Sequence, residues 1–510
     1  MVPTHTAWTR ARRTRDARFD GRFFVAVTTT GIYCRPVCPA PSPLERHVQY
    51  FESAAAAAEA GFRPCLRCRP EVAPGSPAWR GTPVTVQRAL RLIEAGVTDG
   101  IRVHDLAASL GMGPRHLHRL FLQHLGASPL AVIQTRRLHF AKQLVDGTTM
   151  PLAQIAMASG FGSIRRFNAA VRQTWQRTPS TLRRERAGRP DAAPFAFVLA
   201  YRPPYDWDGL LRFLALRAVR GLEQVEEGRY TRTVDVAGDA GWIDVTHDPA
   251  RRAVRLAVHG ASPKSLYTIV TRVRRMFDLD ADPDAIGAHL GRDALLRVAV
   301  TRTPGRRVPG SWDGFELAVR AVLGQQCSVA AARTLVSRVV DAHGDPSNGP
   351  EGLGRVFPTA PALADAPIER LGILPRRAAA VRALARAVAD NPMLLSPDGD
   401  HSDVRAALVA IPGIGPWTAE YVAMRSLGDP DAFPAGDLAL ARAAGLDARA
   451  LASRAETWRP WRAYAALHLW MGESHESHDT RTRGRRESGR TAATRRSGRS
   501  ALRGAISRSA

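Results

Sequence analysis

The chain has 510 residues and a formal net charge of +25, and 45% of its residues are hydrophobic. This length corresponds to roughly three or four domains of about 100–200 residues each. The positive charge favours nucleic acid as a partner, although a GC-rich genome that selects arginine would give a similar composition. No run of 18 apolar residues is present, and residues 1–15 lack the apolar segment of a signal peptide, so we expect neither a membrane span nor secretion.

Four cysteines near the N-terminus form two close pairs, and the chain has one further cysteine, Cys327. The pairs are C-x3-C and C-x2-C, made by Cys34, Cys38, Cys65 and Cys68. Thiolates with this spacing on two short turns are typical of a tetrahedral Zn²⁺ site. A purely structural zinc knot is the more common use of such a cluster. Disulfides between these cysteines are less expected. We expect the protein in a reducing cytoplasm, where thiols stay free.

The segments that flank the cysteines resemble a known family. They include Thr29-Thr30-Gly31-Ile32-Tyr33-Cys34-Arg35-Pro36-Val37-Cys38 and Gly61-Phe62-Arg63-Pro64-Cys65-Leu66-Arg67-Cys68. Residues 8–72 are similar to the N-terminal domain of Ada-type adaptive-response proteins. The resemblance implies that Cys34 irreversibly accepts a methyl group from a methylated DNA phosphate, with the other three cysteines as fellow zinc ligands. Alkylation would remove negative charge from the site and tighten DNA binding.

Residues 84–185 show a helical pattern that contains two similar units. Residues 103–121 and 152–168 each predict a short helix, a glycine turn and a second helix, which is the shape of a helix-turn-helix. Pro114 suits the first position of its helix, and Ser163 suits an N-cap. A connecting helix is predicted from an apolar face made by Leu130, Ile133, Leu138, Ala141 and Leu144.

The paired units resemble the AraC-type DNA-binding domain. The side chains that could reach base edges or phosphates lie on the two predicted recognition helices. They are Arg115, His116, His118 and Arg119 in the first unit, and Arg165, Arg166 and Asn168 in the second. Any one of these arginines could instead simply solvate a helix face. Operator DNA is the expected partner, and RNA polymerase is the expected partner of an activator.

Further strand-like stretches follow this helical region. They are residues 195–201, 230–236, 241–246 and 253–258, and helices are expected near 208–219 and 264–276. Residues 74–83 and 187–194 are rich in proline and glycine and are predicted to be linkers. From 307 to 473 helices dominate again, and the basic stretch from 474 to 510 is predicted to be disordered.

A glycine-rich turn between two helical stretches predicts a helix-hairpin-helix. It reads Ile411-Pro412-Gly413-Ile414-Gly415-Pro416-Trp417-Thr418, and its glycines allow backbone N–H groups to approach a DNA phosphate. Non-catalytic DNA-binding proteins also carry this motif. Downstream, the loop Phe433-Pro434-Ala435-Gly436-Asp437 ends in one carboxylate.

Residues 194–473 resemble the helix-hairpin-helix DNA glycosylases, in the branch called 3-methyladenine DNA glycosylase II. The resemblance implies that Asp437 is the catalytic aspartate and that Trp417, Tyr421 and Trp470 form an aromatic cleft. It places Gln326 where a residue fills the gap left by the flipped base. Gly413, Gly415 and Thr418 are expected to contact DNA. Alternatively, Asp437 could serve as a helix cap and nothing more, and the aromatic residues could simply be part of the hydrophobic core.

The implied chemistry suits these residue types. Cleavage of an N-glycosidic bond builds positive charge on the sugar, which a sheltered carboxylate stabilises. Alkylated bases are cationic and stack well on aromatic rings. Strand-cleaving relatives use a lysine near the hairpin, where this chain has Thr418, so we expect a monofunctional enzyme. An iron–sulfur cluster is not expected, because no cysteine follows Cys327, which we expect in the core.

The sequence therefore predicts a multidomain, mainly α protein with α+β parts. The expected units are a small zinc α/β domain (1–75), an all-α double helix-turn-helix (84–186), an α+β domain (194–300), an all-α helix-hairpin-helix glycosylase domain (301–473) and a basic tail (474–510). We expect a monomer that binds one zinc ion and double-stranded DNA. The alternatives are a regulator whose C-terminal half only grips DNA, and a general DNA-compacting protein.

Overall fold

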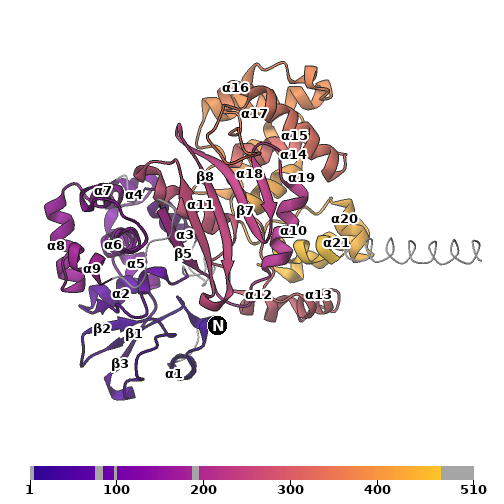
Figure 1. The fold of residues 1–510 in the computed structure, drawn as a ribbon. Helices are drawn as coiled ribbons and strands as arrows, with labels where there is room; N and C mark the ends of the chain where they lie inside the picture. Colours follow the sequence, from indigo (N-terminus) through magenta and orange to yellow (C-terminus); the bar gives the residue numbers. More distant parts are fainter. Residues whose placement is uncertain (1–4, 75–83, 97–99, 186–194, 473–510) are drawn as a thin grey trace, which may run out of the picture.

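The computed structural model describes residues 5–74, 84–96, 100–185 and 195–472. Along the chain, a small sheet region leads into a helical region, then a larger sheet, then a second helical region (Figure 1). The larger sheet lies in the middle, between helices α4–α9 on one side and α14–α21 on the other. Both predicted linkers and the basic tail fall almost entirely outside the described residues. In the described ranges, no helix combines the length and apolar character needed to cross a membrane.

The N-terminal region folds around a sheet with strand order β3-β1-β2-β4. Strands β1 and β3 and strands β1 and β2 are antiparallel, whereas β2 and β4 are parallel. The elements are α1 (His5–Thr14), η1 (Ala17–Phe19), β1 (Phe24–Val27), β2 (Ile32–Cys34), η2 (Glu45–His47), β3 (Val48–Phe51), α2 (Ala54–Glu59), β4 (Arg63–Pro64) and η3 (Pro70–Val72). Phe23, Phe24 and Tyr33 are among its buried side chains.

The first helical region confirms both predicted helix-turn-helix units. Its helices are α3 (Val84–Gly96), α4 (Val103–Ser109), α5 (Pro114–Leu125), α6 (Pro129–Gly147), α7 (Leu152–Ala158), α8 (Ile164–Trp175) and α9 (Pro179–Arg184). Pro114 begins α5, and the Ser163 hydroxyl caps α8 by accepting from Arg166 N. On the predicted apolar face of α6, Ile133, Ala141 and Leu144 are buried and Leu138 is half-buried, whereas Leu130 in the first turn is 54% exposed.

The central region is an antiparallel sheet in the order β5-β9-β8-β7-β6. Its elements are β5 (Phe195–Ala200), α10 (Trp207–Arg217), β6 (Glu223–Glu226), β7 (Arg229–Val236), β8 (Asp239–Asp248), η4 (Pro249–Arg251), β9 (Ala253–His259), η5 (Pro263–Ser265), α11 (Leu266–Met276), α12 (Pro283–Leu290) and α13 (Arg297–Arg302). The four predicted strands are confirmed. The edge strand β6 was missed, because Glu223–Glu226 is short and polar.

The C-terminal region is helical, as predicted. Its elements are α14 (Gly314–Leu323), α15 (Val329–His343), α16 (Ala360–Ala364), η6 (Ile368–Leu371), α17 (Pro375–Asp390), α18 (His401–Ala410), α19 (Pro416–Arg425), α20 (Leu438–Ala444), α21 (Ala448–Ala455) and η7 (Glu456–Trp458). Residues 462–472 are also helical. Cys327 follows α14 and is half-buried, so its predicted place in the core is wrong: it lies at a helix end beside exposed residues.

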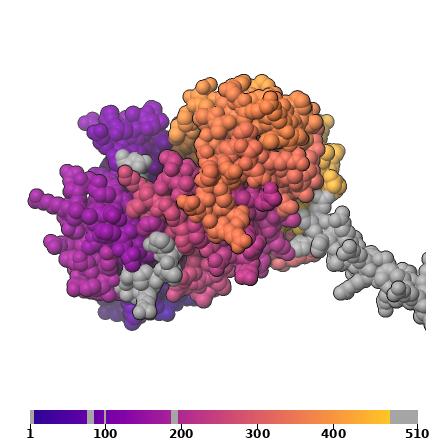
Figure 2. All heavy atoms as spheres, turned by 45° about the horizontal axis from the view of Figure 1, so that its top comes forward, coloured from indigo at the N-terminus to yellow at the C-terminus, as the bar shows by residue number. Residues whose placement is uncertain are grey.

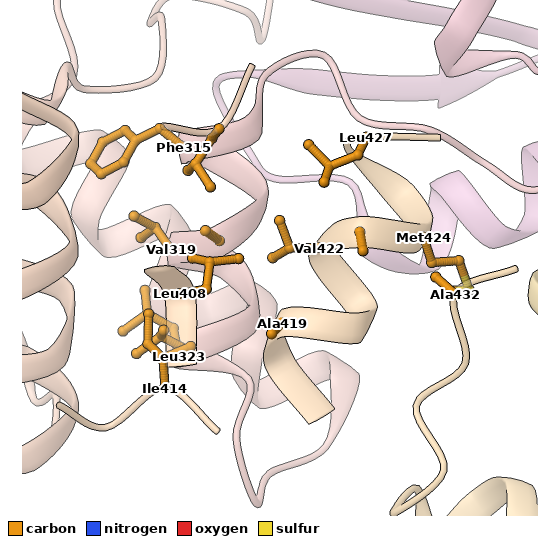
Figure 3. Close-up of a cluster of buried hydrophobic side chains, with 14 of the residues drawn as sticks. Phe315, Val319, Leu323, Leu408, Ile414, Ala419, Val422, Met424, Leu427 and Ala432 are labelled. Carbon is orange, nitrogen blue, oxygen red and sulfur yellow. The ribbon is translucent and has the colours of Figure 1, made fainter. Parts of the chain in front are cut away.

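One apolar cluster holds the hairpin helices in place. Figure 3 shows Phe315, Val319 and Leu323 of α14 facing the side chains of α18 and α19. Val319, Leu323, Leu408 and Val422 are fully buried. Because α19 begins at the hairpin and carries Trp417 and Tyr421, this packing fixes the base of the candidate active site.

A second apolar cluster joins the helix-turn-helix region to the central sheet. It combines side chains of α6, α7 and α8 with side chains of β5, β8 and β9. Phe140 of α6 stacks on Phe197 of β5, with ring centroids 6.5 Å apart. Accordingly, Figure 2 shows the sheet region in continuous contact with both helical regions.

Candidate metal centre and active site

The four N-terminal cysteines meet at one edge of the small sheet. Cys34 ends β2, and Cys65 follows β4 directly. Because these two strands run parallel, with Tyr33 paired to Pro64, the residues after them emerge together. The Sγ atoms of Cys34, Cys38, Cys65 and Cys68 all lie within 4.8 Å of one another. Sulfurs at about 2.3 Å from a tetrahedral zinc ion would be about 3.8 Å apart, so the set fits one zinc.

The surroundings of the sulfurs also favour a cation. Hydrogen bonding with Cys38 and Cys65, together with burial, raises the pKa of the Cys34 thiol above its ordinary value. Four thiolates this close together would repel one another, so a cation between them would be needed to keep all four deprotonated. The backbone N–H of Arg35 donates to Cys68 Sγ at 3.3 Å, as in many thiolate metal sites whose sulfurs are held by outer hydrogen bonds.

The cysteines differ in access to solvent. Cys65 and Cys68 are buried, whereas Cys34 and Cys38 are half-buried. The first pair is therefore the more accessible of the two from solvent.

Asp437 sits at the N-terminus of α20 with both carboxylate oxygens in use. Its Oδ1 accepts a hydrogen bond from Leu440 N at 2.9 Å, so the helix-cap interpretation is confirmed. Trp417 Nε1 donates to Oδ2 at 2.8 Å, and Trp470 Nε1 donates to Oδ1 at 3.2 Å. The carboxylate is half-buried between these two indoles, which come from α19 and from the helix at 462–472.

Aromatic rings continue from Asp437 along α19. Trp417 and Tyr421 are four residues apart, so they share one helix face, and their rings stack at 5.2 Å with an interplanar angle of 8°. Trp470 meets Tyr421 edge-on at 6.2 Å. All three rings are half-buried rather than sealed in the core, so the structure brings together the predicted aromatic set beside a carboxylate.

The sequence interpretation missed the arginines behind this wall. Arg425 Nη1 donates to the Tyr421 hydroxyl at 2.7 Å. Although burial opposes ionisation, Arg425 and Arg217 lower the pKa of Tyr421 below its ordinary value. Arg217 and Arg425 also lie 3.7 Å and 4.8 Å from the centre of the Phe213 ring. Phe213 and Arg217 belong to α10 of the sheet region, so no local pattern pointed to them.

The hairpin depends on a close approach at Gly413 and on hydrogen bonds from Gln325. Gly413 has φ +87°, and a Cβ there would lie 2.7 Å from Ala380 Cβ. Gly415 precedes α19 and faces open space. Gln325 Nε2 donates to Gly413 O at 2.9 Å and lies 3.4 Å from the Thr418 hydroxyl. Thr418 is 2% exposed, so its side chain packs under the hairpin, and this geometry does not favour a direct DNA contact.

Gln326 is exposed at the end of α14. Its φ is +53°, which an L side chain adopts rarely, and its Oε1 accepts from Arg376 Nη2 at 2.8 Å. An exposed side chain on a strained turn next to the hairpin suits a residue that enters DNA.

Most predicted DNA-contacting side chains of the helix-turn-helix units are solvent-exposed. Arg115, His116, His118 and Arg119 lie on the exposed face of α5. Arg165 and Arg166 are exposed on α8, whereas Asn168 is half-buried. Arg119 and His116 contact each other at 2.9 Å across one helical turn.

Four family models match the chain in sequence order. They are the metal binding domain of Ada (residues 7–71), a helix-turn-helix domain (106–185), the AlkA N-terminal domain (196–313) and the HhH-GPD superfamily of base excision DNA repair proteins (319–456). A Mycobacterium tuberculosis protein named as a probable bifunctional transcriptional activator/DNA repair enzyme AlkA is 44% identical over 477 residues, which covers 91% of this chain and 96% of that protein.

The chain belongs to this AlkA-type family of bifunctional activator/DNA repair proteins. The C-terminal half of this AlkA-type chain is also 36% identical to DNA-3-methyladenine glycosylase 2 of Escherichia coli, over 54% of this chain and 97% of that protein. The solved 3-methyladenine DNA glycosylase of Archaeoglobus fulgidus shares the fold, with a TM-score of 0.50 and 22% identity over 55% of this chain and 98% of that one. The predicted family resemblances and fold class are confirmed, and so is DNA as a partner.

Proposed function

We propose that the C-terminal half is a monofunctional DNA glycosylase that excises alkylated bases such as 3-methyladenine. The observation that carries this proposal is the Asp437 carboxylate, held by two indole N–H groups beside a stacked aromatic wall. The aromatic faces would receive the flipped, cationic base, and the carboxylate would stabilise the sugar cation that forms as the base leaves. Water completes the reaction, because Thr418 stands where a lysine would be needed for strand cleavage.

The DNA is proposed to be held from two sides. Backbone N–H groups at Gly413 and Gly415 and the N-terminus of α19 suit a phosphate. Gln326 is proposed to occupy the space of the flipped nucleotide.

Replacing the catalytic carboxylate tests the glycosylase proposal. Asp437→Asn keeps a side-chain oxygen for the helix cap but removes the negative charge, so base release should fall at least about 100-fold. Asp447→Asn is the matched control, because Asp447 caps α21 in the same way, accepting from Ala450 N at 2.8 Å. Single-turnover release of methyladenine from alkylated duplex DNA is the measurement.

The control should keep the normal rate. A normal rate in Asp437→Asn would overturn the proposal, and so would a wild-type protein that binds alkylated DNA but releases no base. The second outcome would favour the alternative in which the C-terminal half only grips DNA.

We infer for the N-terminal region that Cys34 removes a methyl group from a DNA methylphosphotriester. A bound zinc ion would keep the four sulfurs deprotonated and nucleophilic. The Cys34 sulfur attacks the methyl carbon, an S–C bond forms as the O–C bond breaks, and the phosphate oxygen leaves with the electron pair as a diester anion. The partial exposure of Cys34 supports this role.

A mass measurement tests the methyl transfer. After incubation with methylated DNA, the peptide carrying Cys34 should gain about 14 Da, the mass of one CH₂. Fragmentation should place the added mass on Cys34 rather than on Cys38, its half-buried neighbour. An unmodified peptide, or modification of Cys38 alone, would contradict the assignment.

The helix-turn-helix region is proposed to read operator DNA through the exposed side chains of α5 and α8. Loss of one thiolate charge on methylation would reduce repulsion from DNA phosphates and strengthen operator binding. We also propose that RNA polymerase is the partner of the activator, and that the protein acts as a monomer in a reducing compartment. The proposed domain boundaries are 1–75 for methyl transfer, 84–186 for operator binding, and 194–300 with 301–473 for the glycosylase.

A further inference from the structure

We propose that Arg405 is a positioning residue for Asp437: it fixes the loop at residues 428–437 by joining Glu420 of α19 to Asp429 of that loop. The inference rests on the proposed catalytic role of Asp437. Neither the family models nor the names of the relatives assign a role to Arg405.

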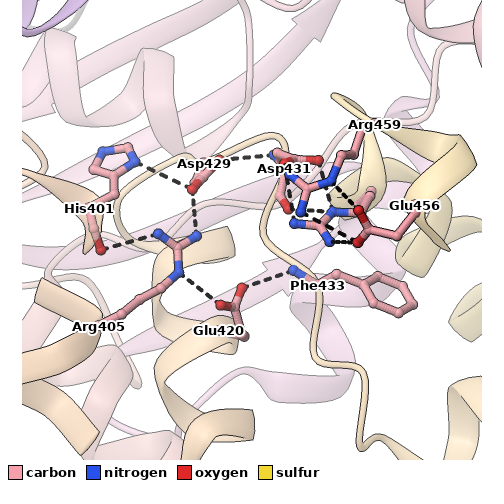
Figure 4. A network of polar contacts seen from close by, with 9 residues as sticks. His401, Arg405, Glu420, Asp429, Asp431, Phe433, Glu456 and Arg459 are labelled. Carbon is pink, nitrogen blue, oxygen red and sulfur yellow. Dashed lines mark hydrogen bonds and ion pairs between the residues drawn. The ribbon is translucent and has the colours of Figure 1, made fainter. Parts of the chain in front are cut away.

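The guanidinium of Arg405 reaches two carboxylates at once (Figure 4). Its Nε donates to Glu420 Oε1 at 2.9 Å, and its Nη2 donates to Asp429 Oδ2. A third donor, Nη1, reaches the backbone oxygen of His401 at 3.1 Å. Arg405 thereby links α18 to α19 and to the loop, with its side chain only 23% exposed.

Both carboxylates also accept a hydrogen bond from a backbone N–H of the loop. Glu420 Oε2 accepts from Phe433 N at 3.0 Å, and Asp429 Oδ1 accepts from Asp431 N at 2.9 Å. Phe433 is four residues before Asp437, and the turn between them is closed by Asp437 N donating to Pro434 O at 2.9 Å. Burial works against the charge, yet hydrogen bonds from His401 and Arg405 hold the pKa of Asp429 well below its ordinary value.

A second ion cluster attaches the same loop to the C-terminal helix. Arg462 Nε donates to Asp431 Oδ1 at 2.8 Å and to Asp431 O at 2.9 Å, and Arg459 and Glu456 complete the cluster in Figure 4. Ala463 N also donates to Pro430 O at 2.9 Å. Hydrogen bonds and ion pairs therefore hold the loop against the helix at 462–472 as well as against α19.

These fastenings matter because the partners of Asp437 lie on those same two helices. Trp417 is three residues before Glu420 on α19, and Trp470 lies eight residues after Arg462. The clusters thus set the position of the carboxylate relative to both indoles. A displacement of about 1 Å at a reacting group can cost about 100-fold in rate. Loss of the Arg405 contacts should therefore slow the chemical step.

The test compares Arg405→Gln with a control arginine in single-turnover base release. Arg386→Gln is the control, since Arg386 makes a similar pair with Asp365 at 2.7 Å on the exposed face of α17. We expect Arg405→Gln to slow release by about 10- to 100-fold at a temperature where both variants are fully folded, with the affinity for abasic-site duplex close to that of the control. Arg405→Lys should recover only part of the rate, because lysine lacks the planar fork through which Nε and Nη2 of Arg405 reach Glu420 and Asp429.

A double variant separates positioning from general destabilisation. If Arg405 acts through Asp437, adding Arg405→Gln to Asp437→Asn should cost no further rate after subtraction of spontaneous base loss. Additive losses would overturn the inference, as would a normal rate in Arg405→Gln beside a slow Asp437→Asn. Loss of DNA affinity in parallel with the rate would also overturn it. A normal rate in Asp437→Asn would instead remove the proposed function and this inference together.

Discussion

The carboxylate of Asp437 meets two demands that the sequence presented as alternatives. One oxygen caps α20, and both oxygens accept from indole N–H groups. Three donors hold the side chain in one orientation, and this is what a group that must face a developing sugar cation requires. A cap and a catalyst are therefore compatible at a single residue.

Burial of a different carboxylate predicts a pH effect on stability. Asp278 lies beside Arg307, accepting from Tyr464 OH at 2.9 Å and from Val308 N at 3.2 Å. Burial raises the pKa of Asp278 to about 7. Because the folded pKa exceeds that of the unfolded chain, the contribution of Asp278 to stability is full below about pH 4 and is lost as the pH rises through 7.

Asp278→Asn should therefore stabilise the protein at pH 8 by at least about 1 kcal/mol and change little at pH 4. Asparagine also suits the positive φ of this position, +48°. Denaturant unfolding at the two pH values is the measurement, and Asp447→Asn is a control at an exposed carboxylate. Equal effects at both pH values would show that the charge of Asp278 is not the cause.

At the scale of elements, the two glycines of the hairpin differ in their surroundings. Gly413 and Gly415 stand two residues apart, yet only Gly413 has a positive φ and a close neighbour. We expect Gly413→Ala to lower the free energy of unfolding by at least about 1–2 kcal/mol. Gly415→Ala should leave stability nearly unchanged, because a Cβ there meets open space, and it should weaken binding to duplex DNA if the hairpin backbone contacts a phosphate as proposed.

Thermal unfolding and DNA titration on both variants measure these effects. Equal stability loss in the two variants would contradict the assignment of strain to Gly413. Unchanged DNA affinity in Gly415→Ala would show that the hairpin backbone does not approach the phosphate closely.

At the scale of the whole molecule, the metal centre is tied to the glycosylase half by arginines. Arg35, next to Cys34, donates to the buried Asp20. Arg202 of the sheet region donates to Asp20 O at 2.9 Å and to Asp280 O at 2.6 Å. Arg22 pairs with Asp282, the cap of α12. The regions of the two proposed activities are therefore packed against each other and are not independent domains joined only by a linker.

Several features of this protein followed from its sequence alone. The cysteine spacing identified the metal centre, the helix caps and turn glycines placed both helix-turn-helix units, and strand-like stretches placed β5, β7, β8 and β9. These features depend on interactions over a few residues, where backbone sterics and local hydrogen bonds leave few choices. The chemistry of Asp437 could be proposed from sequence because its loop and aromatic partners carry a family pattern.

The tertiary structure alone decided which charges meet. The chain has 72 lysines and arginines and 47 acidic residues, so a sequence offers each arginine many partners. Arg405 joins carboxylates 15 and 24 residues away, and Arg22 joins Asp282 across 260. Side-chain ion pairs have no sequence periodicity of their own, because packing of the helices determines which side chains come within reach. The same reason hid the Arg217 and Arg425 contacts behind the aromatic wall.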